Sequence, residues 1–146
     1  MALSIRLATE ASDLEACMAL RWEVFVEEQG VAAHEEQDGQ DHLCQHVLAR
    51  LDGQAVGAAR FKQIDDYVKI QRVCVPKQHR RKSIGADMMR FIGQEAKRSA
   101  SARFAILGAQ THAMAFYQKL GFEEEGQVYM DAGIPHMDMR LNLQDR

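Results

Sequence analysis

A predicted strand, basic loop and helix in the middle of the sequence constrain this chain more than any other feature. Residues 67–75 are rich in β-branched side chains and stop at Pro76, which lacks the N–H that a strand ladder needs. Residues 83–99 predict an amphipathic helix with one apolar face, formed by Ile84, Met88, Phe91, Ile92 and Ala96. The loop between them concentrates four cations in six residues: Lys77, Arg80, Arg81 and Lys82. A strand therefore leads through a compact basic loop into a helix.

The start of that helix is a predicted anion site. The first N–H groups of a helix lack internal partners and carry partial positive charge. Gly85 and Ala86 leave the backbone open to a ligand, and the loop cations would donate charge-assisted hydrogen bonds. Each cation there opposes the helix dipole at a cost of a few tenths of a kcal/mol, and a bound anion would reverse that sign. The sequence has neither the GxxxxGK[ST] nor the GxGxxG pattern. A solvated surface loop is the alternative reading.

Other local patterns predict a mixed sheet with helices on both faces. Ser12 and Glu15 have the spacing of a capping box, and Asp52-Gly53 is typical of a type I′ hairpin turn. Gly121 is placed to end a helix. The predicted strands are residues 4–8, 46–51, 54–62, 67–75, 103–108, 127–130 and 136–141. The predicted helices are residues 12–25, 83–99 and 111–120, with a short helix near the end of the polar segment 30–41.

Length and composition exclude several classes of protein. The 146 residues fit a single domain over 1–146. A net charge of -3 gives no overall attraction to nucleic acid, and no apolar run approaches the roughly 20 residues that span a bilayer. The three cysteines are far apart and form no CxxC, so we expect no disulfide framework, no metal and a cytoplasmic location. A homodimer is left open.

Two motifs resemble those of the GNAT superfamily of acetyl-CoA-dependent N-acetyltransferases. The first is similar to the family's [QR]-x-x-G-x-[GA] loop and reads Arg80-Arg81-Lys82-Ser83-Ile84-Gly85-Ala86, after Val73-Cys74-Val75. The second is similar to A-x-x-[FL]-Y-x-K-x-G-F and covers residues 113–122. The element order matches over nearly the whole chain. The resemblance implies an α/β fold, a mixed α+β sheet of about six to seven strands flanked by about four helices.

The resemblance also implies roles for individual residues. Acetyl-CoA is the implied cosubstrate, held by Val73, Cys74, Val75, Arg80, Arg81, Lys82, Ser83, Ile84, Gly85, Ala86, Gln110 and Phe116. Tyr117 is the implied general acid for the departing thiolate, although its apolar helix face equally suits a core residue. Ser83 stands where the family usually has glycine. A positive φ there would cost serine roughly 1 kcal/mol, whereas an extended backbone would let Ser83 act as an N-cap.

The base and the acceptor are less constrained. Glu28, Asp38 and His136 are candidate bases for a primary amine, and a chain of water molecules is an alternative. Residues 22–49 contain seven carboxylates and no Lys or Arg, which predicts attraction of a small cationic amine. We therefore expect acetyl transfer to a small-molecule amine, with no nucleic acid or membrane partner. A non-catalytic acyl-CoA-binding or sensing module on the same fold is the alternative function.

Overall fold

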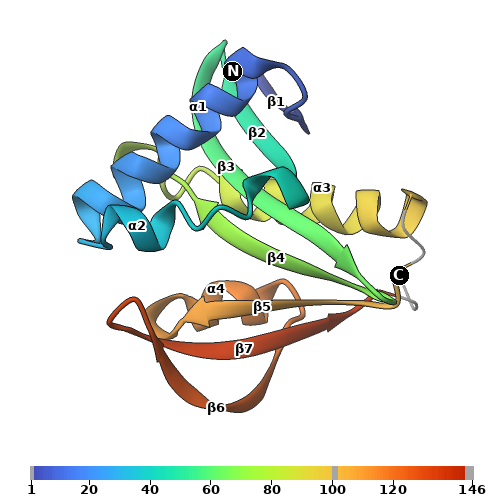
Figure 1. The fold of residues 1–146 in the computed structure, drawn as a ribbon. Coiled ribbons are helices and arrows are strands. Elements are labelled where there is room, and N and C mark those ends of the chain that lie inside the picture. The colour runs from blue at the N-terminus through green and yellow to red at the C-terminus, as the bar shows by residue number, and fades with distance from the viewer. Residues whose placement is uncertain (1, 100–101, 144–146) are drawn as a thin grey trace. The chain divides into compact units, whose positions relative to one another are not determined.

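The computed structural model describes residues 2–99 and 102–143 (Figure 1). Its strands are β1 (Leu3–Leu7), β2 (Gln45–Leu51), β3 (Gln54–Ile64), β4 (Tyr67–Cys74), β5 (Phe104–Gln110), β6 (Glu123–Asp131) and β7 (Ile134–Asn142). Its α-helices are α1 (Ala11–Arg21), α2 (Ala33–Glu36), α3 (Ile84–Ser99) and α4 (Met114–Lys119). The strand order is β1-β2-β3-β4-β5-β7-β6, and β4 pairs with β5 in parallel. This is the mixed α/β fold expected from the sequence.

The chain divides into two compact units. Unit 1 comprises the described residues of Met1–Phe61 and Arg72–Ile92, and unit 2 those of Lys62–Gln71 and Gly93–Arg146. Each unit is described by itself below. The single domain expected from the sequence stays a prediction.

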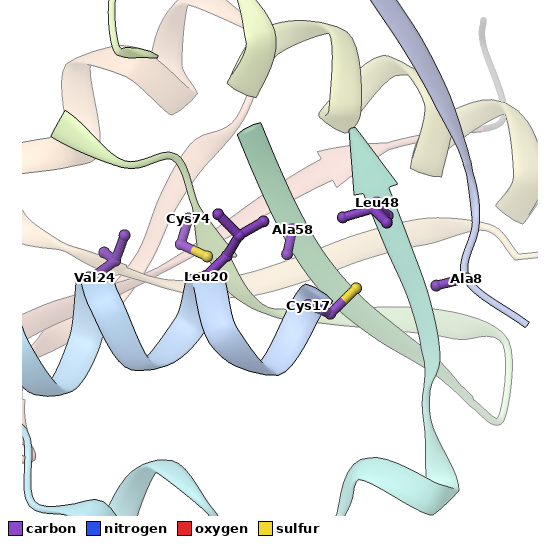
Figure 2. Close-up of a cluster of buried hydrophobic side chains, with 7 residues drawn as sticks. All are labelled: Ala8, Cys17, Leu20, Val24, Leu48, Ala58 and Cys74. Carbon is purple, nitrogen blue, oxygen red and sulfur yellow. The ribbon is translucent and has the colours of Figure 1, made fainter. Parts of the chain in front are cut away.

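Helices cover both faces of the sheet in unit 1. Figure 2 shows Cys17 and Leu20 of α1, with Val24 of the helical segment that continues from it, facing side chains from three strands and the segment after β1, namely Leu48, Ala58, Cys74 and Ala8. The adjacent residue on β3, Gly57, faces the other way, and a Cβ there would come within 3.0–3.1 Å of Met88 and Ile84 of α3. Because successive strand residues point to opposite faces, α1 and α3 pack on opposite sides of β3. The helices therefore flank the sheet as predicted.

The β2–β3 hairpin follows its turn chemistry. Asp52 and Gly53 have φ values of 52° and 86°, and both must be positive in a type I′ turn. The predicted hairpin is confirmed.

The predicted capping box at the start of α1 is wrong. The helix begins at Ala11 after an extended Glu10, and no side chain caps it. Ser12 therefore lies inside the first turn. Asp13 in that turn accepts hydrogen bonds from Arg6 at 3.1 Å and Arg50 at 2.9 Å, so long-range ion pairs attach the helix start to β1 and β2. A local sequence pattern could not reveal these partners.

A π-helical segment continues directly from α1. It spans Trp22–Glu28, where the sequence predicted the same α-helix as far as Phe25. π-Helical turns inside longer helices are uncommon in proteins. Where they do occur, they are frequently part of a functional site. The polar segment that follows forms α2 and a 3₁₀ turn at Asp41–Leu43.

In unit 2, β5 and β7 alternate between a buried and a half-exposed face. Ala105, Leu107 and Met139 are buried, whereas β6 is exposed along its whole length. The predicted strands 127–130 and 136–141 are too short, because only Ala132 and Gly133 form the turn, with φ values of 51° and 74°. A two-residue turn of this kind keeps the flanking residues in the ladder.

The end of α4 is a Schellman motif. Gly121 has a φ of 101°, its N–H bonds to the carbonyl of Gln118, and the N–H of Phe122 bonds to that of Tyr117. The rings of Tyr117 and Phe122 pack edge to face with centroids 5.8 Å apart, which adds the hydrophobic contact usual in this motif. The predicted glycine stop is confirmed. No helix among the described residues is long and apolar enough to cross a membrane.

Candidate functional site

The basic loop before α3 contains strained backbone. Among residues 2–99 and 102–143, six non-glycine residues have positive φ, and three of them, Asp52, Asp65 and Ala132, lie in hairpin turns. The other three are Arg72 in β4 (58°), Arg81 (68°) and Ser83 (64°). Such conformations cost about 1–3 kcal/mol each and cluster where a protein binds ligands. Two of the three therefore fall within the predicted phosphate loop.

Ser83 adopts the conformation that favours the family's glycine. Its φ of 64° is left-handed and differs from the extended backbone of an ordinary N-cap residue. Its carbonyl nevertheless accepts the first helical hydrogen bond, from the N–H of Asp87 at 3.0 Å. Of the two alternatives set by the sequence, the strained one is observed.

Positive and negative φ values alternate along the loop. Lys82, which is exposed, separates the left-handed Arg81 and Ser83, and this kind of alternation turns successive N–H groups toward a common concave side. Ile84 is 2% exposed and anchors the helix start, whereas Gly85 and Ala86 are half-buried. The loop thus combines exposed cations with an anchored helix N-terminus.

Arg80 is engaged inside unit 1. Its guanidinium donates two hydrogen bonds of 2.7 Å to Glu28 and one of 2.8 Å to the carbonyl of Val75. The Arg80 hydrogen bonds hold the pKa of the Glu28 carboxyl below its ordinary value. A carboxylate with a lowered pKa is a weak proton acceptor, which disfavours Glu28 as the base. Lys77, Arg81 and Lys82 are the other exposed cations of the loop.

The end of β4 is distorted next to this loop. Arg72 has a positive φ, and its guanidinium bonds to the carbonyls of Glu35 and Glu36 and lies 3.4 Å from Asp38. The Cys74 side chain is buried in the core cluster, where burial raises the pKa of its thiol to about 12, so we expect a ligand to meet the backbone of Cys74. Val73 and Val75 are half-buried. Unit 1 therefore brings together Glu28, residues 73–75 and residues 80–86.

The acidic segment 22–49 is compensated by arginines from elsewhere in unit 1. Arg21 donates to Glu36 at 2.5 Å and Asp41 at 2.6 Å. Arg60, which is fully buried, donates to Asp38 at 2.7 Å and Asp41 at 2.8 Å. With Glu28 held by Arg80, four of the seven carboxylates are paired. The premise that this segment lacks compensating cations is therefore wrong. Asp38 is ionised and paired with Arg60, which disfavours it as a base.

Unit 2 holds the remaining predicted residues. Tyr117 is 8% exposed, and the exposed Phe116 packs against its ring with centroids 4.9 Å apart. The Gln110 side-chain oxygen lies 2.6 Å from Nε2 of His112. Gln110 also sits opposite His136 in the β5–β7 ladder. Gln110 and His136 are therefore neighbours, and Tyr117 lies on α4, which follows β5.

His136 has a defined tautomer. Its Nδ1 is 2.7 Å from the carbonyl of Ile134, which can only accept, so Nδ1 carries the hydrogen. A neutral ring then presents a lone pair on Nε2. The His136 ring stacks on Tyr129, with centroids 5.8 Å apart, and the Tyr129 hydroxyl donates to Asp138 at 2.7 Å. Sequence reasoning missed Tyr129 and Asp138, because only the strand register brings them beside His136.

Metal ligands do not gather in the part of the chain that the structure describes. Within residues 2–99 and 102–143, no three His, Cys, Asp or Glu side chains are arranged to hold an ion. All three cysteines are free.

Comparison with known proteins shows which family this chain belongs to. The family described as acetyltransferase (GNAT) domain matches residues 8–143. The uncharacterized N-acetyltransferase YjcF of Bacillus subtilis is 37% identical over 134 residues, covering 91% of this chain and 95% of that protein. The crystal structure of Escherichia coli ElaA has a TM-score of 0.85 at 29% identity, covering 97% and 100% of the two chains. An acyl-CoA N-acyltransferase from Pseudomonas aeruginosa has a TM-score of 0.83 at 31% identity, covering 96% and 98%. The chain is an acyltransferase and belongs to the GNAT acetyltransferase family.

Proposed function

We propose that this protein transfers the acetyl group of acetyl-CoA to the primary amine of a small cationic molecule. Family membership supports acyl transfer from coenzyme A to an amine in general. The observation that carries the proposal for this chain is the left-handed backbone at Arg81 and Ser83 in an exposed basic loop. Unit 1 maintains that strain at the start of a helix, where a phosphate would be stabilised.

The cofactor contacts follow from the loop. The backbone N–H groups of residues 83–86, with Arg81 and Lys82, would bind the pyrophosphate, and Arg80 would orient the loop through Val75 and Glu28. The distorted end of β4 would offer backbone groups of residues 73–75 to the pantetheine arm. Gln110 and Phe116 of unit 2 are proposed as further contacts to that arm.

The reaction removes two protons from a protonated amine and supplies one to the departing sulfur. The amine nitrogen attacks the thioester carbonyl carbon, a C–N bond forms, and the C–S bond breaks. The amine, with a pKa of roughly 10 when aliphatic, must be neutral to attack and gives up a further proton as the amide forms. Tyr117 would donate its phenolic proton to the departing sulfur. The fixed ring of Tyr117, packed between Phe116 and Phe122, supports this role.

His136 is the proposed base. The hydrogen bond from Nδ1 to the Ile134 carbonyl leaves Nε2 of the neutral ring as the acceptor. Glu28 is less suited, since Arg80 stabilises its ionised form. We further expect the chain to act as one domain in the cytoplasm, where its free cysteines would stay reduced.

Thiol release and coenzyme A binding test this proposal together. Purified protein should release free thiol from acetyl-CoA only when an amine is present. By titration calorimetry, Arg81→Ala with Lys82→Ala should weaken coenzyme A binding by tenfold or more, from the loss of two charge-assisted contacts. Arg90→Ala, which removes an exposed cation of α3, is the matched control and should bind normally. Unchanged binding in the double variant would remove the loop from the cofactor site.

A further inference from the structure

Asp138 differs from every other sheltered carboxylate that the structure describes. Six carboxylates among residues 2–99 and 102–143 are buried or half-buried: Asp13, Glu36, Asp41, Asp87, Glu95 and Asp138. The first five each have an arginine partner. Asp138 has no arginine partner within those residues. It accepts a hydrogen bond from a neutral group, the hydroxyl of Tyr129. Because Asp138 is half-buried and lacks an arginine partner in this part of the chain, its charge is available to pair with a cationic ligand.

A nearby arginine is directed elsewhere. Arg140 lies two residues along β7 and therefore on the same face as Asp138. Its guanidinium carbon lies 3.6 Å from the centre of the Phe104 ring, and one nitrogen is 3.9 Å from Glu125. The cation that could neutralise Asp138 is thus held by other groups.

The surroundings of Asp138 are built across three strands. Gly108 on β5 is directly opposite Asp138, and a Cβ at Gly108 would collide with the Tyr129 hydroxyl. Tyr129 therefore reaches from β6 across β7 to β5, and glycine is needed where it arrives. Burial, and then the bond to Asp138, raise the pKa of Tyr129, so its hydroxyl stays a donor. One Asp138 oxygen is occupied by that donor, which fixes the carboxylate.

His136 lies on the same face of β7 as Asp138. It is two residues from Asp138 along β7, which corresponds to about 7 Å of strand. Tyr129 contacts both side chains, stacking on one and bonding to the other. The Nε2 lone pair of His136 and the carboxylate of Asp138 therefore lie on the same face of β7, about 7 Å of strand apart.

We propose that Asp138 binds a second cationic group of the acceptor while His136 takes the proton of the attacking amine. This inference rests on the proposed function and names its substrate class: amines with a second positive charge about four methylene groups away, a chain comparable in length to two residues of strand. The preference for cationic acceptors then comes from unit 2, since arginines already pair with four of the seven carboxylates in the acidic segment of unit 1.

Matched acceptors test the substrate class. Thiol release is measured with 1,4-diaminobutane, with butylamine, which lacks the second charge, and with 4-aminobutanoate, which reverses it. For the unmodified protein, kcat/KM should be about tenfold higher for the diamine than for butylamine, as expected for one charge-assisted contact. Equal values for the two would overturn the inference.

Variants assign that preference to Asp138. In Asp138→Asn the amide oxygen can still accept the Tyr129 hydrogen bond, so folding should persist. The variant should lose the preference for the diamine, with the ratio of kcat/KM for the diamine to that for butylamine falling about tenfold, and KM for acetyl-CoA should stay unchanged. Asp138→Lys should shift the preference toward 4-aminobutanoate. Glu123→Gln, which removes an exposed carboxylate of β6, is the control and should keep the preference. A preference retained in Asp138→Asn would overturn the inference.

Binding without turnover separates this inference from the proposed function. Calorimetric titration of 1,4-diaminobutane into the complex with coenzyme A needs no chemistry. Weaker binding in Asp138→Asn by about tenfold supports the site even if no amine is acetylated, a result that would reject only the proposed reaction. Equal binding in the two proteins would reject the site.

Discussion

Arg80 and Glu28 are joined by two parallel hydrogen bonds of 2.7 Å, although 52 residues separate them in the sequence. A bidentate pair of this kind fixes both groups more firmly than a single contact. One member belongs to the predicted phosphate loop and the other ends the π-helical segment Trp22–Glu28. The pair thereby connects the loop to a segment that the sequence suggested only as an acidic surface.

Replacing Glu28 by glutamine tests whether it serves as a base. We expect kcat to change less than tenfold, because Arg80 keeps the pKa of Glu28 low and makes it a poor proton acceptor. His136→Ala should lower kcat by 10²-fold or more, within the range of general-base contributions. Steady-state rates with saturating amine provide the measurement. A loss in Glu28→Gln as large as that in His136→Ala would reassign the base.

Ser83→Gly should stabilise the protein. The φ of 64° is costly for serine and free for glycine, which predicts a gain of about 1 kcal/mol in the free energy of unfolding. Ser83→Ala keeps the Cβ and should give no comparable gain. Urea denaturation measures both. Coenzyme A affinity should be retained in Ser83→Gly, and a loss there would show that the hydroxyl contacts the cofactor.

Arg60→Met should destabilise unit 1 strongly. Arg60 is fully buried, and its removal leaves Asp38 and Asp41 without one of their partners. Breaking a buried ion pair from one side costs about 3 kcal/mol. Arg90→Met breaks an exposed pair within α3 and should stay within about 0.5 kcal/mol. A similar small effect for both variants would show that the buried arginine contributes little.

Acid should weaken the folded state through the same ion pairs. The Arg60 hydrogen bond lowers the pKa of Asp38, and that of Arg80 lowers the pKa of Glu28. The unfolded chain then binds more protons below its ordinary carboxyl pKa of about 4. The stability from these groups is complete above that pKa, and it is lost progressively as the pH falls from there through the lower pKa values of the folded state. Urea midpoints should therefore fall between about pH 5 and pH 2. Arg60→Met should show a shallower decline.

Tyr117→Phe tests the general acid. We expect kcat to fall tenfold or more, since the phenolic proton no longer reaches the departing sulfur. The ring contacts with Phe116 and Phe122 survive in the variant, so the thermal midpoint should change little. A well-folded variant with unchanged kcat would leave Tyr117 as a core residue only.

Local patterns predicted the parts of the fold that depend on neighbouring residues. The Asp52-Gly53 turn and the Gly121 stop follow from backbone preferences within a few residues, and both were found. The basic loop was likewise visible as a run of cations before an amphipathic helix. The strain at Arg81 was not visible, because nothing in the side chain of arginine marks a left-handed backbone.

Long-range pairing explains what the sequence could not predict. The acidic segment looked uncompensated because Arg60 and Arg72 are distant in the chain and meet it only after β3 and β4 form. Asp138 and Tyr129 were overlooked for a similar reason, since their contact depends on the register of β6 against β7. Side chains that meet through sheet register leave no local spacing to read.

The π-helical segment Trp22–Glu28 also limits how this chain can change in length. Each residue of an α-helix advances by 100° around the axis, which follows from about 3.6 residues per turn. The π-helix closes i→i+5 hydrogen bonds and turns somewhat less per residue, so deleting one residue within the segment would turn Glu28 away from Arg80 by roughly a quarter of a turn. The contact between Glu28 and Arg80 anchors the basic loop. It therefore depends on the number of residues between α1 and Glu28 as well as on which residues they are. Natural relatives should vary here by substitution more readily than by insertion or deletion.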